Sequence, residues 1–150
     1  MSIDWQLTID CARPAPLVRF WAVALGYVPP EPPAGHASWR DYYISLGEPD
    51  SSFEPDDDGS DRLVDPAGLR PPIWFQVVPE GKSGKNRLHL DLRVGGGRTV
   101  PLAQRRAAVD AKVATLLDAG AKVVRMADDT AVDHYYAVLA DPEGNEFCVV

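Results

Sequence analysis

Hydrophobic and polar residues alternate most clearly over residues 86–94, and this stretch predicts a strand. The apolar positions are Leu88, Leu90, Leu92 and Val94, and the polar positions between them are Arg87, His89, Asp91 and Arg93. Because successive side chains of a strand point to opposite faces, the pattern predicts one buried apolar face and one polar face. The polar face either meets solvent or lines a ligand-binding cavity, and the rest of the chain bears on that choice.

Several further segments have the alternation or the composition of strands. They are residues 3–11, 27–28, 39–46, 62–65, 73–78, 122–126, 134–139 and 146–150. Residues 39–46 are assigned to a strand because they are rich in aromatic and β-branched residues, which favour strands.

Two segments repeat apolar residues with the helical period. The first begins near Pro14, has apolar residues at i, i+3, i+4 and i+7 from Leu17, and is closed by Gly26. The second has a candidate N-cap at Thr99 and ends at Gly120.

The order of strand, helix and about three strands occurs twice along the chain. A shift of 83 positions superposes residues 3–11 on residues 86–94, and it aligns Gln6 with His89 and Thr8 with Asp91. The two halves therefore have the pattern of repeated modules.

Each half has too small a core to be stable alone, so we expect the modules to pack together. The sequence predicts an α+β fold of two βαβββ modules in one domain. Module one covers about residues 1–80, a linker covers residues 81–85, and module two covers about residues 86–150.

The composition is that of an ordinary globular protein, and it restricts the classes of partner. Of 150 residues, 45% are hydrophobic and 25% are charged, so the chain can bury a core. The net charge of −7 argues against nucleic acid and anionic membranes, which need basic patches. No apolar run is long enough to span a membrane, and the first residues lack the apolar core of a signal peptide. The two cysteines, Cys11 and Cys148, form no recognisable disulfide framework. We expect a cytoplasmic protein.

Polar positions on the predicted strands supply candidate chemistry. His89 could line a pocket and act as a general base, or it could bond Asp91 or Arg87 for structural reasons. Asp10 and Asp91 could form paired carboxylates. The arginines beside Asp91, however, favour ion pairs.

Aromatic residues and a thiol are further candidates. Trp74 and Gln76 could form a wall against a flat or apolar ligand, although ordinary core packing is the alternative. Tyr135 and Tyr136 must point to opposite faces, so at most one can face a pocket. Cys148 lacks a recognisable base, which favours a buried, inert thiol.

Three features together resemble the glyoxalase/bleomycin resistance/dioxygenase superfamily, also called vicinal oxygen chelate, and in particular its glyoxalase-like branch. They are the paired βαβββ modules, the run Lys85-Asn86-Arg87-Leu88-His89-Leu90-Asp91-Leu92, and the ending Asp141-Pro142-Glu143-Gly144-Asn145-Glu146-Phe147-Cys148-Val149. The resemblance covers residues 7–150. It implies curved mixed sheets that enclose a central pocket, and it implies a homodimer.

The resemblance also implies where a metal would bind. In metal-dependent members each module lends one ligand from its first strand and one from its last. The matching positions here are Gln6, Gln76, His89 and Cys148, and Cys148 stands where metal-binding members usually have Glu. These four offer no carboxylate and too few strong zinc ligands, and Glu146 lies about 7 Å further along the strand. We therefore expect a vestigial site without metal or other cofactor.

Three hypotheses for the function follow. The first is a glyoxalase-like protein that binds a small organic molecule in the pocket between its modules, through Gln6, Trp74, Gln76, His89, Asp91 and Cys148. The second is a metal-dependent lyase, isomerase or dioxygenase, whose divalent metal is held by His89, Glu146 and one Gln, with His89 and Glu146 as catalytic candidates. The third is a structural or regulatory dimer whose pocket is filled with side chains.

Overall fold

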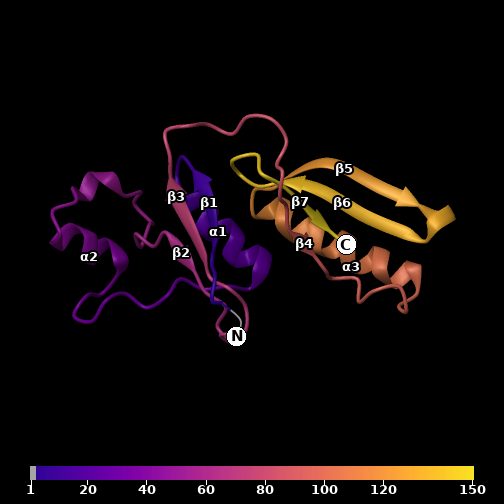
Figure 1. Cartoon of the computed structure of the whole chain (residues 1–150), viewed down its shortest axis with the longest axis horizontal. Coiled ribbons are helices and arrows are strands. Elements are labelled where there is room, and N and C mark those ends of the chain that lie inside the picture. The colour runs from indigo at the N-terminus through magenta and orange to yellow at the C-terminus, as the bar shows by residue number, and fades with distance from the viewer. Residues whose placement is uncertain (1–2) are drawn as a thin grey trace. The chain divides into compact units, whose positions relative to one another are not determined.

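Two mixed β-sheets, one in each half of the chain, form the framework of the protein (Figure 1). The computed structural model describes residues 3–150, and the chain divides into two compact units, Met1–Gly81 and Lys82–Val150. Each unit joins one sheet to helices. The α+β class predicted from the sequence is therefore confirmed.

In the first unit, a three-stranded sheet packs against helix α1. The strands are β1 (Leu7–Cys11), β2 (Arg62–Leu63) and β3 (Ile73–Val77), in the order β1-β3-β2, with β1 parallel and β2 antiparallel to β3. Helix α1 (Pro14–Leu25) starts at a proline and ends at Gly26, whose φ of 71° is left-handed. The first predicted helix is confirmed.

The core of the first unit lies between α1 and one face of this sheet. The buried side chains include Leu17, Phe20, Trp21 and Ala24 of α1 and Leu63, Ile73 and Phe75 of the sheet. The strand predicted at residues 27–28 is only a single bridge between Val28 and Val64. The prolines that follow at 29 and 30 have no N–H to donate, so the strand cannot continue.

Residues 39–46 form a helix, so the prediction of a strand there is wrong. Helix α2 spans Trp39–Ser45, and the 3-10 helix η1 follows at Asp50–Ser52. The Ser38 hydroxyl accepts a hydrogen bond from the Asp41 N–H at 3.0 Å, as an N-cap does. Within the described chain this segment pairs with no strand, and the cap outweighs the strand preference of its aromatic residues.

The second unit contains a four-stranded sheet and the βαβββ order that the sequence predicts. Its strands are β4 (Asp91–Leu92), β5 (Lys122–Asp129), β6 (His134–Ala140) and β7 (Glu146–Val149), in the order β4-β7-β6-β5. Strand β4 runs parallel to β7, and the other pairs are antiparallel. The 3-10 helix η2 (Thr130–Val132) joins β5 to β6.

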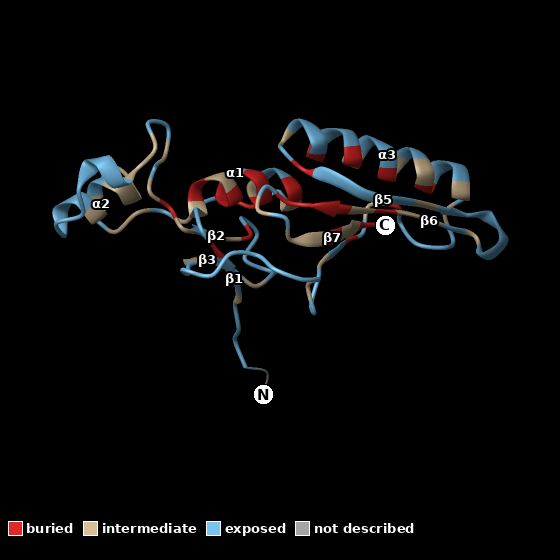
Figure 2. Cartoon of the chain, turned by 90° about the horizontal axis from the view of Figure 1, so that it is seen from above, coloured by how far each residue is buried: buried red, intermediate tan, exposed pale blue. Residues whose placement is uncertain are grey.

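Helix α3 (Leu102–Asp118) packs on one face of this sheet, and its buried residues gather on the side that meets the strands (Figure 2). They include Val109, Val113 and Leu116 of the helix, with Ala137, Leu139, Phe147 and Val149 of the sheet. No helix of residues 3–150 combines the length and the apolar character needed to span a membrane.

Helix α3 starts later than the sequence suggests. Its first residue is Leu102, and Pro101 occupies the N-cap position, so the prediction that Thr99 caps the helix is wrong. The Val100 N–H instead donates to the Gly97 carbonyl at 3.1 Å in a turn. The proline at 101 also disfavours a helical conformation at Val100.

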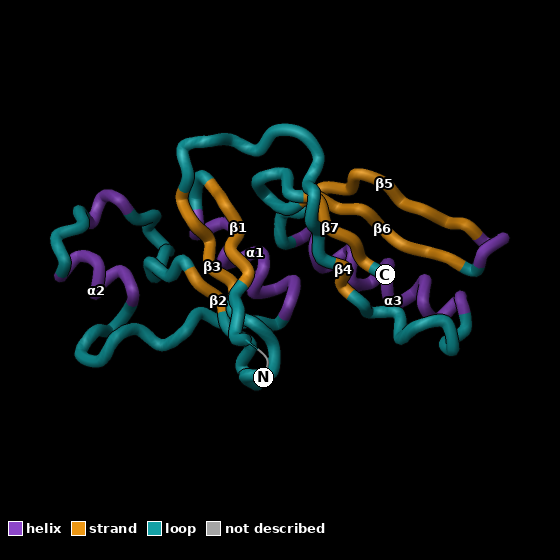
Figure 3. The backbone as a smooth tube through the Cα atoms, in the orientation of Figure 1, coloured by secondary structure: helices purple, strands orange, loops and turns teal. Residues whose placement is uncertain are grey.

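Residues 86–94 form much less strand than their alternation predicts. Only two residues pair as β4, the segment that leads into them is loop (Figure 3), and Leu88, which was expected to be buried, is 84% exposed. Strand β4 lies at the edge of the sheet, and its neighbour β7 begins at Glu146, level with His89. The residues before His89 therefore have no strand beside them in the described chain.

Candidate functional site

A row of four side chains crosses one face of the second sheet. The register places Asp91 beside Cys148, Cys148 beside Val138, and Val138 beside Arg125. Paired residues on neighbouring strands share a face of the sheet. Val149, which alternates with this row, is fully buried on the α3 side. The row therefore lies on the face away from α3.

The surface around this row is hollowed to a volume of about 370 Å³. Its lining includes charged side chains from Lys85, Arg125 and Glu146, the rings of His134 and Tyr136, and apolar atoms of Val138. Ligand pockets range from about 300 to 1,000 Å³ and combine apolar walls with a few polar groups. This hollow has both properties.

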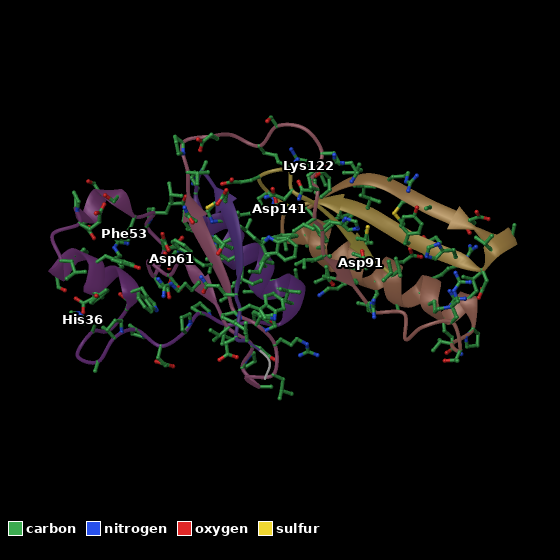
Figure 4. The ribbon with its side chains drawn as sticks, in the orientation of Figure 1. His36, Phe53, Asp61, Asp91, Lys122 and Asp141 are labelled. Carbon is green, nitrogen blue, oxygen red and sulfur yellow. The ribbon has the colours of Figure 1, made fainter. Side chains whose placement is uncertain are left out.

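His89, Asp91 and Cys148 meet at one end of the row. One potential ligand atom from each residue lies within 4.8 Å of the other two, and His89 Nε2 is 3.4 Å from Asp91 Oδ1. Figure 4 labels Asp91 in this part of the second unit. Burial and the Asp91 carboxylate raise the pKa of the Cys148 thiol, while Lys85 and Arg125 oppose this effect. The thiol is therefore held in its neutral form near neutral pH.

Glu146 lines the same hollow, but its carboxylate is already bound. It accepts a hydrogen bond from the Asn86 N–H at 3.2 Å and pairs with Lys82 Nζ at 3.1 Å. These contacts, led by the Asn86 hydrogen bond, lower the pKa of Glu146. The side chain is a fixed carboxylate that ties the loop before β4 to β7.

Arg125, Tyr136 and His134 line the hollow without having been identified as site residues from the sequence. The Arg125 guanidinium donates to the Tyr136 hydroxyl and lies 5.4 Å from the centre of its ring. The rings of His134 and Tyr136 are 4.9 Å apart. The alternation of residues 134, 136 and 138 could have placed Tyr136 beside Val138, but only the strand register brings Arg125 to them.

In the first unit, Trp74 and Gln76 lie on the face of β3 opposite its buried residues. Trp74 is level with Thr8, and its Nε1 donates to Asp61 Oδ2 at 2.8 Å. Gln76 is level with Asp10. The two side chains are thus held on one polar face, and Trp74 is fixed there by Asp61.

Gln6 is not brought close to Gln76. Gln6 is exposed and precedes β1. Because Leu7 is paired with Ile73, Gln6 is level with residue 72. Gln6 and Gln76 are therefore four residues apart along the strand direction, which is about 13 Å. Asp91 pairs with Cys148 in the second unit as Thr8 pairs with Trp74 in the first. By register, the first-unit counterpart of Cys148 is therefore Trp74 instead of Gln76.

The sequence model of the Glyoxalase-like domain matches residues 6–150. The chain belongs to the glyoxalase-like domain family. The resemblance found in the sequence is confirmed, and the match includes both glyoxalase-like units and every residue of the row. A search of curated proteins gives no match.

Solved structures of the same superfamily share the fold of this glyoxalase-like chain at low sequence identity. A glyoxalase/bleomycin resistance protein/dioxygenase family enzyme from Burkholderia phytofirmans is 19% identical, with a TM-score of 0.58 over 96% of this chain and 94% of that one. A superfamily member from Sphaerobacter thermophilus is 14% identical, with a TM-score of 0.55 over 100% and 97%. A fosfomycin resistance protein from Listeria monocytogenes, solved with Mn(II) and dihydroxypropylphosphonic acid, is 8% identical, with a TM-score of 0.58 over 99% and 89%.

The donors of this glyoxalase-like protein suit some metals better than others. The sequence predicts no carboxylate at the metal positions, but the fold brings the Asp91 carboxylate to His89 and Cys148. Imidazole, carboxylate and thiolate form a donor set that Zn²⁺ accepts. Mg²⁺ and Mn²⁺ prefer several oxygen ligands, and the second carboxylate nearby, Glu146, is bound to Lys82. The set fits zinc in composition, provided that Cys148 loses its proton.

Proposed function

We propose that this glyoxalase-like protein binds a small organic molecule on the polar face of the β4-β7-β6-β5 sheet, without a resident metal. The observation that carries the proposal is the row Asp91–Cys148–Val138–Arg125, which lines a hollow of about 370 Å³ on the face that α3 does not cover. The side chains of this row are partly exposed, so a ligand entering the hollow can reach them, and the hollow combines polar groups with the apolar atoms of Val138.

The ligand contacts predicted from the sequence are Gln6, Trp74, Gln76, His89, Asp91 and Cys148. Of these, His89, Asp91 and Cys148 line the hollow on this sheet, and we propose them as its ligand contacts. Support is strongest for His89, Asp91 and Cys148, because these three converge. The absence of a resident metal is proposed because three donors converge here, of which only one is a carboxylate, and the carboxylate of Glu146 is bound to Lys82.

A thermal-shift screen of small organic molecules tests the proposal. A ligand at one hundred times its Kd stabilises the folded state by about 2.7 kcal/mol, so the melting temperature should rise by about 5 °C or more. His89→Ala should abolish the rise, whereas His36→Ala should preserve it, because His36 bonds Asp41 in the first unit. A compound library without hits, or hits unaffected by His89→Ala, would contradict the proposal.

A second candidate is a metal-dependent lyase, isomerase or dioxygenase. The clustering of His89, Asp91 and Cys148 within 4.8 Å favours it. Elemental analysis of freshly purified protein and of the His89→Ala variant separates the two candidates. Stoichiometric metal that disappears in the variant would establish the metal-dependent candidate and overturn the metal-free one.

We also propose that the two units form one domain, and that the protein is a cytoplasmic homodimer. Cys11 and Cys148 are not joined in a disulfide, which supports a reducing compartment. The solution mass, measured by light scattering, tests the dimer, which should have twice the chain mass of 16.4 kDa.

A further inference from the structure

Two arginine–tyrosine pairs occupy opposite sides of β6, and they differ in one respect. Tyr135 and Tyr136 are adjacent in the strand, so their side chains point to opposite faces. The Arg106 guanidinium lies 5.1 Å from the Tyr135 ring centre, and the Arg125 guanidinium lies 5.4 Å from the Tyr136 ring centre. The geometry of the two pairs is therefore similar.

In the pair on the α3 side, both the guanidinium and the hydroxyl contact carboxylates of the protein. Arg106 is bonded to the Asp128 carboxylate, and the Tyr135 hydroxyl donates to Asp110 at 2.6 Å. Each polar group of this pair has an acidic partner from the protein itself. No further charged group is needed there.

The pair on the polar face has no such acid. The guanidinium of Arg125 donates to the Tyr136 hydroxyl, and no carboxylate of residues 3–150 forms an ion pair with it. Lys85 lines the same hollow and is likewise without an ion pair within the described chain. The acids of the hollow are engaged elsewhere, since Glu146 pairs with Lys82 and Asp91 faces His89.

The hollow is lined by as many acidic side chains, Asp91 and Glu146, as basic ones, Lys85 and Arg125, yet neither base forms an ion pair with either acid. The chain has 22 acidic and 15 basic residues, so carboxylates are abundant. A guanidinium that is fixed by a ring and a hydroxyl, yet has no protein carboxylate, is suited to an external one, because its planar fork matches the two oxygens of an oxyanion.

We propose that the ligand of this hollow is a small organic anion, and that Arg125 pairs with its carboxylate or phosphonate group. This inference rests on the proposed function and specifies its ligand class. Tyr136 and His134 provide the wall for the body of the ligand, next to the apolar atoms of Val138. Tyr136 positions the guanidinium through its hydroxyl.

The test compares benzoate with benzamide, which has the same ring and a neutral head group. Binding to the full-length, ¹⁵N-labelled chain is measured at pH 7 by NMR titration. Benzoate should bind at least about tenfold more tightly than benzamide, and this preference should weaken as salt screens the ion pair. Arg125→Gln should abolish the preference, and Arg125→Lys should keep part of it.

Arg106→Gln is the matched control, because it removes the equivalent guanidinium from the other face and should leave the preference intact. Equal binding of both probes, or a preference that survives Arg125→Gln in a folded variant, would overturn the anion proposal and leave the proposed function standing. If neither probe nor any screened compound shifts the resonances of β4, β6 and β7, the proposed function fails as well.

Discussion

Cys148 lies among charges that act on its thiol in opposite directions. Burial and Asp91 raise its pKa, and Lys85 and Arg125 lower it. Because a raised thiol pKa leaves little thiolate at pH 8, Cys148 should react slowly with iodoacetamide. Asp91→Asn removes one of the raising effects, so alkylation at pH 8 should become several times faster, as followed by mass spectrometry.

Two controls make this prediction specific. Cys148→Ala reports the background from Cys11, which is buried. Asp10→Asn removes an exposed carboxylate from the first unit and should not change the rate at Cys148. An unchanged or slower rate in Asp91→Asn would show that Asp91 does not control the thiol.

At the scale of single residues, the sequence identifies the polar groups that belong to one strand. His89, Asp91 and Cys148 were selected by alternation and by resemblance, and the structure brings these three together. Arg125 was missed, and the choice between Tyr135 and Tyr136 stayed open, because their place near Cys148 depends on the pairing of β5, β6 and β7. A sequence pattern gives the face of a residue within its strand, but it does not give the register between strands.

At the scale of elements, helix α3 supports the sheet that carries the site, and two adjacent leucines test this support. Leu116 is completely buried, whereas Leu117 is 41% exposed. Leu116→Ala should lower the free energy of unfolding by about 3 kcal/mol, because it leaves a cavity in the core. Leu117→Ala, the matched control, should change it by less than about 1 kcal/mol.

Urea unfolding followed by circular dichroism measures both values. Equal losses in the two variants would mean that α3 does not pack on the sheet through the face described. A decrease in the free energy of unfolding in Leu116→Ala alone would show that the face of α3 with Leu116 packs on the sheet and supports the polar row.

The first predicted helix is correct because local residue signals mark both of its ends. Two of the errors have different causes: in α2 the aromatic composition was given more weight than the cap, and before β4 the alternation was not matched by a neighbouring strand. Helix α1 is marked by Pro14 and Gly26 at its ends. Helix α2 also has a local signal, Ser38 followed by Asp41 three positions later, but its aromatic content suggested a strand. Residues before β4 alternate well and still form loop, since a strand needs a neighbour to accept its hydrogen bonds.

At the scale of the whole molecule, the family and the α+β class could be inferred from the sequence because their evidence is spread along the chain. The family match spans residues 6–150, so individual errors such as α2 did not affect it. The ligand class was beyond the sequence, since it depends on which charges remain without a partner after folding. In the hollow of the second unit, the basic side chains without an ion pair in the described chain are Arg125 and Lys85.

The central claim, that the polar face of the second sheet binds a small organic molecule, is tested most directly by mapping a ligand on the protein. A compound from the screen is titrated into ¹⁵N-labelled protein, and the backbone amide resonances are followed by NMR. We expect saturable shifts at Asp91, Val138 and Cys148, which lie side by side on β4, β6 and β7. Saturable shifts that leave these three amides unmoved would contradict the central claim.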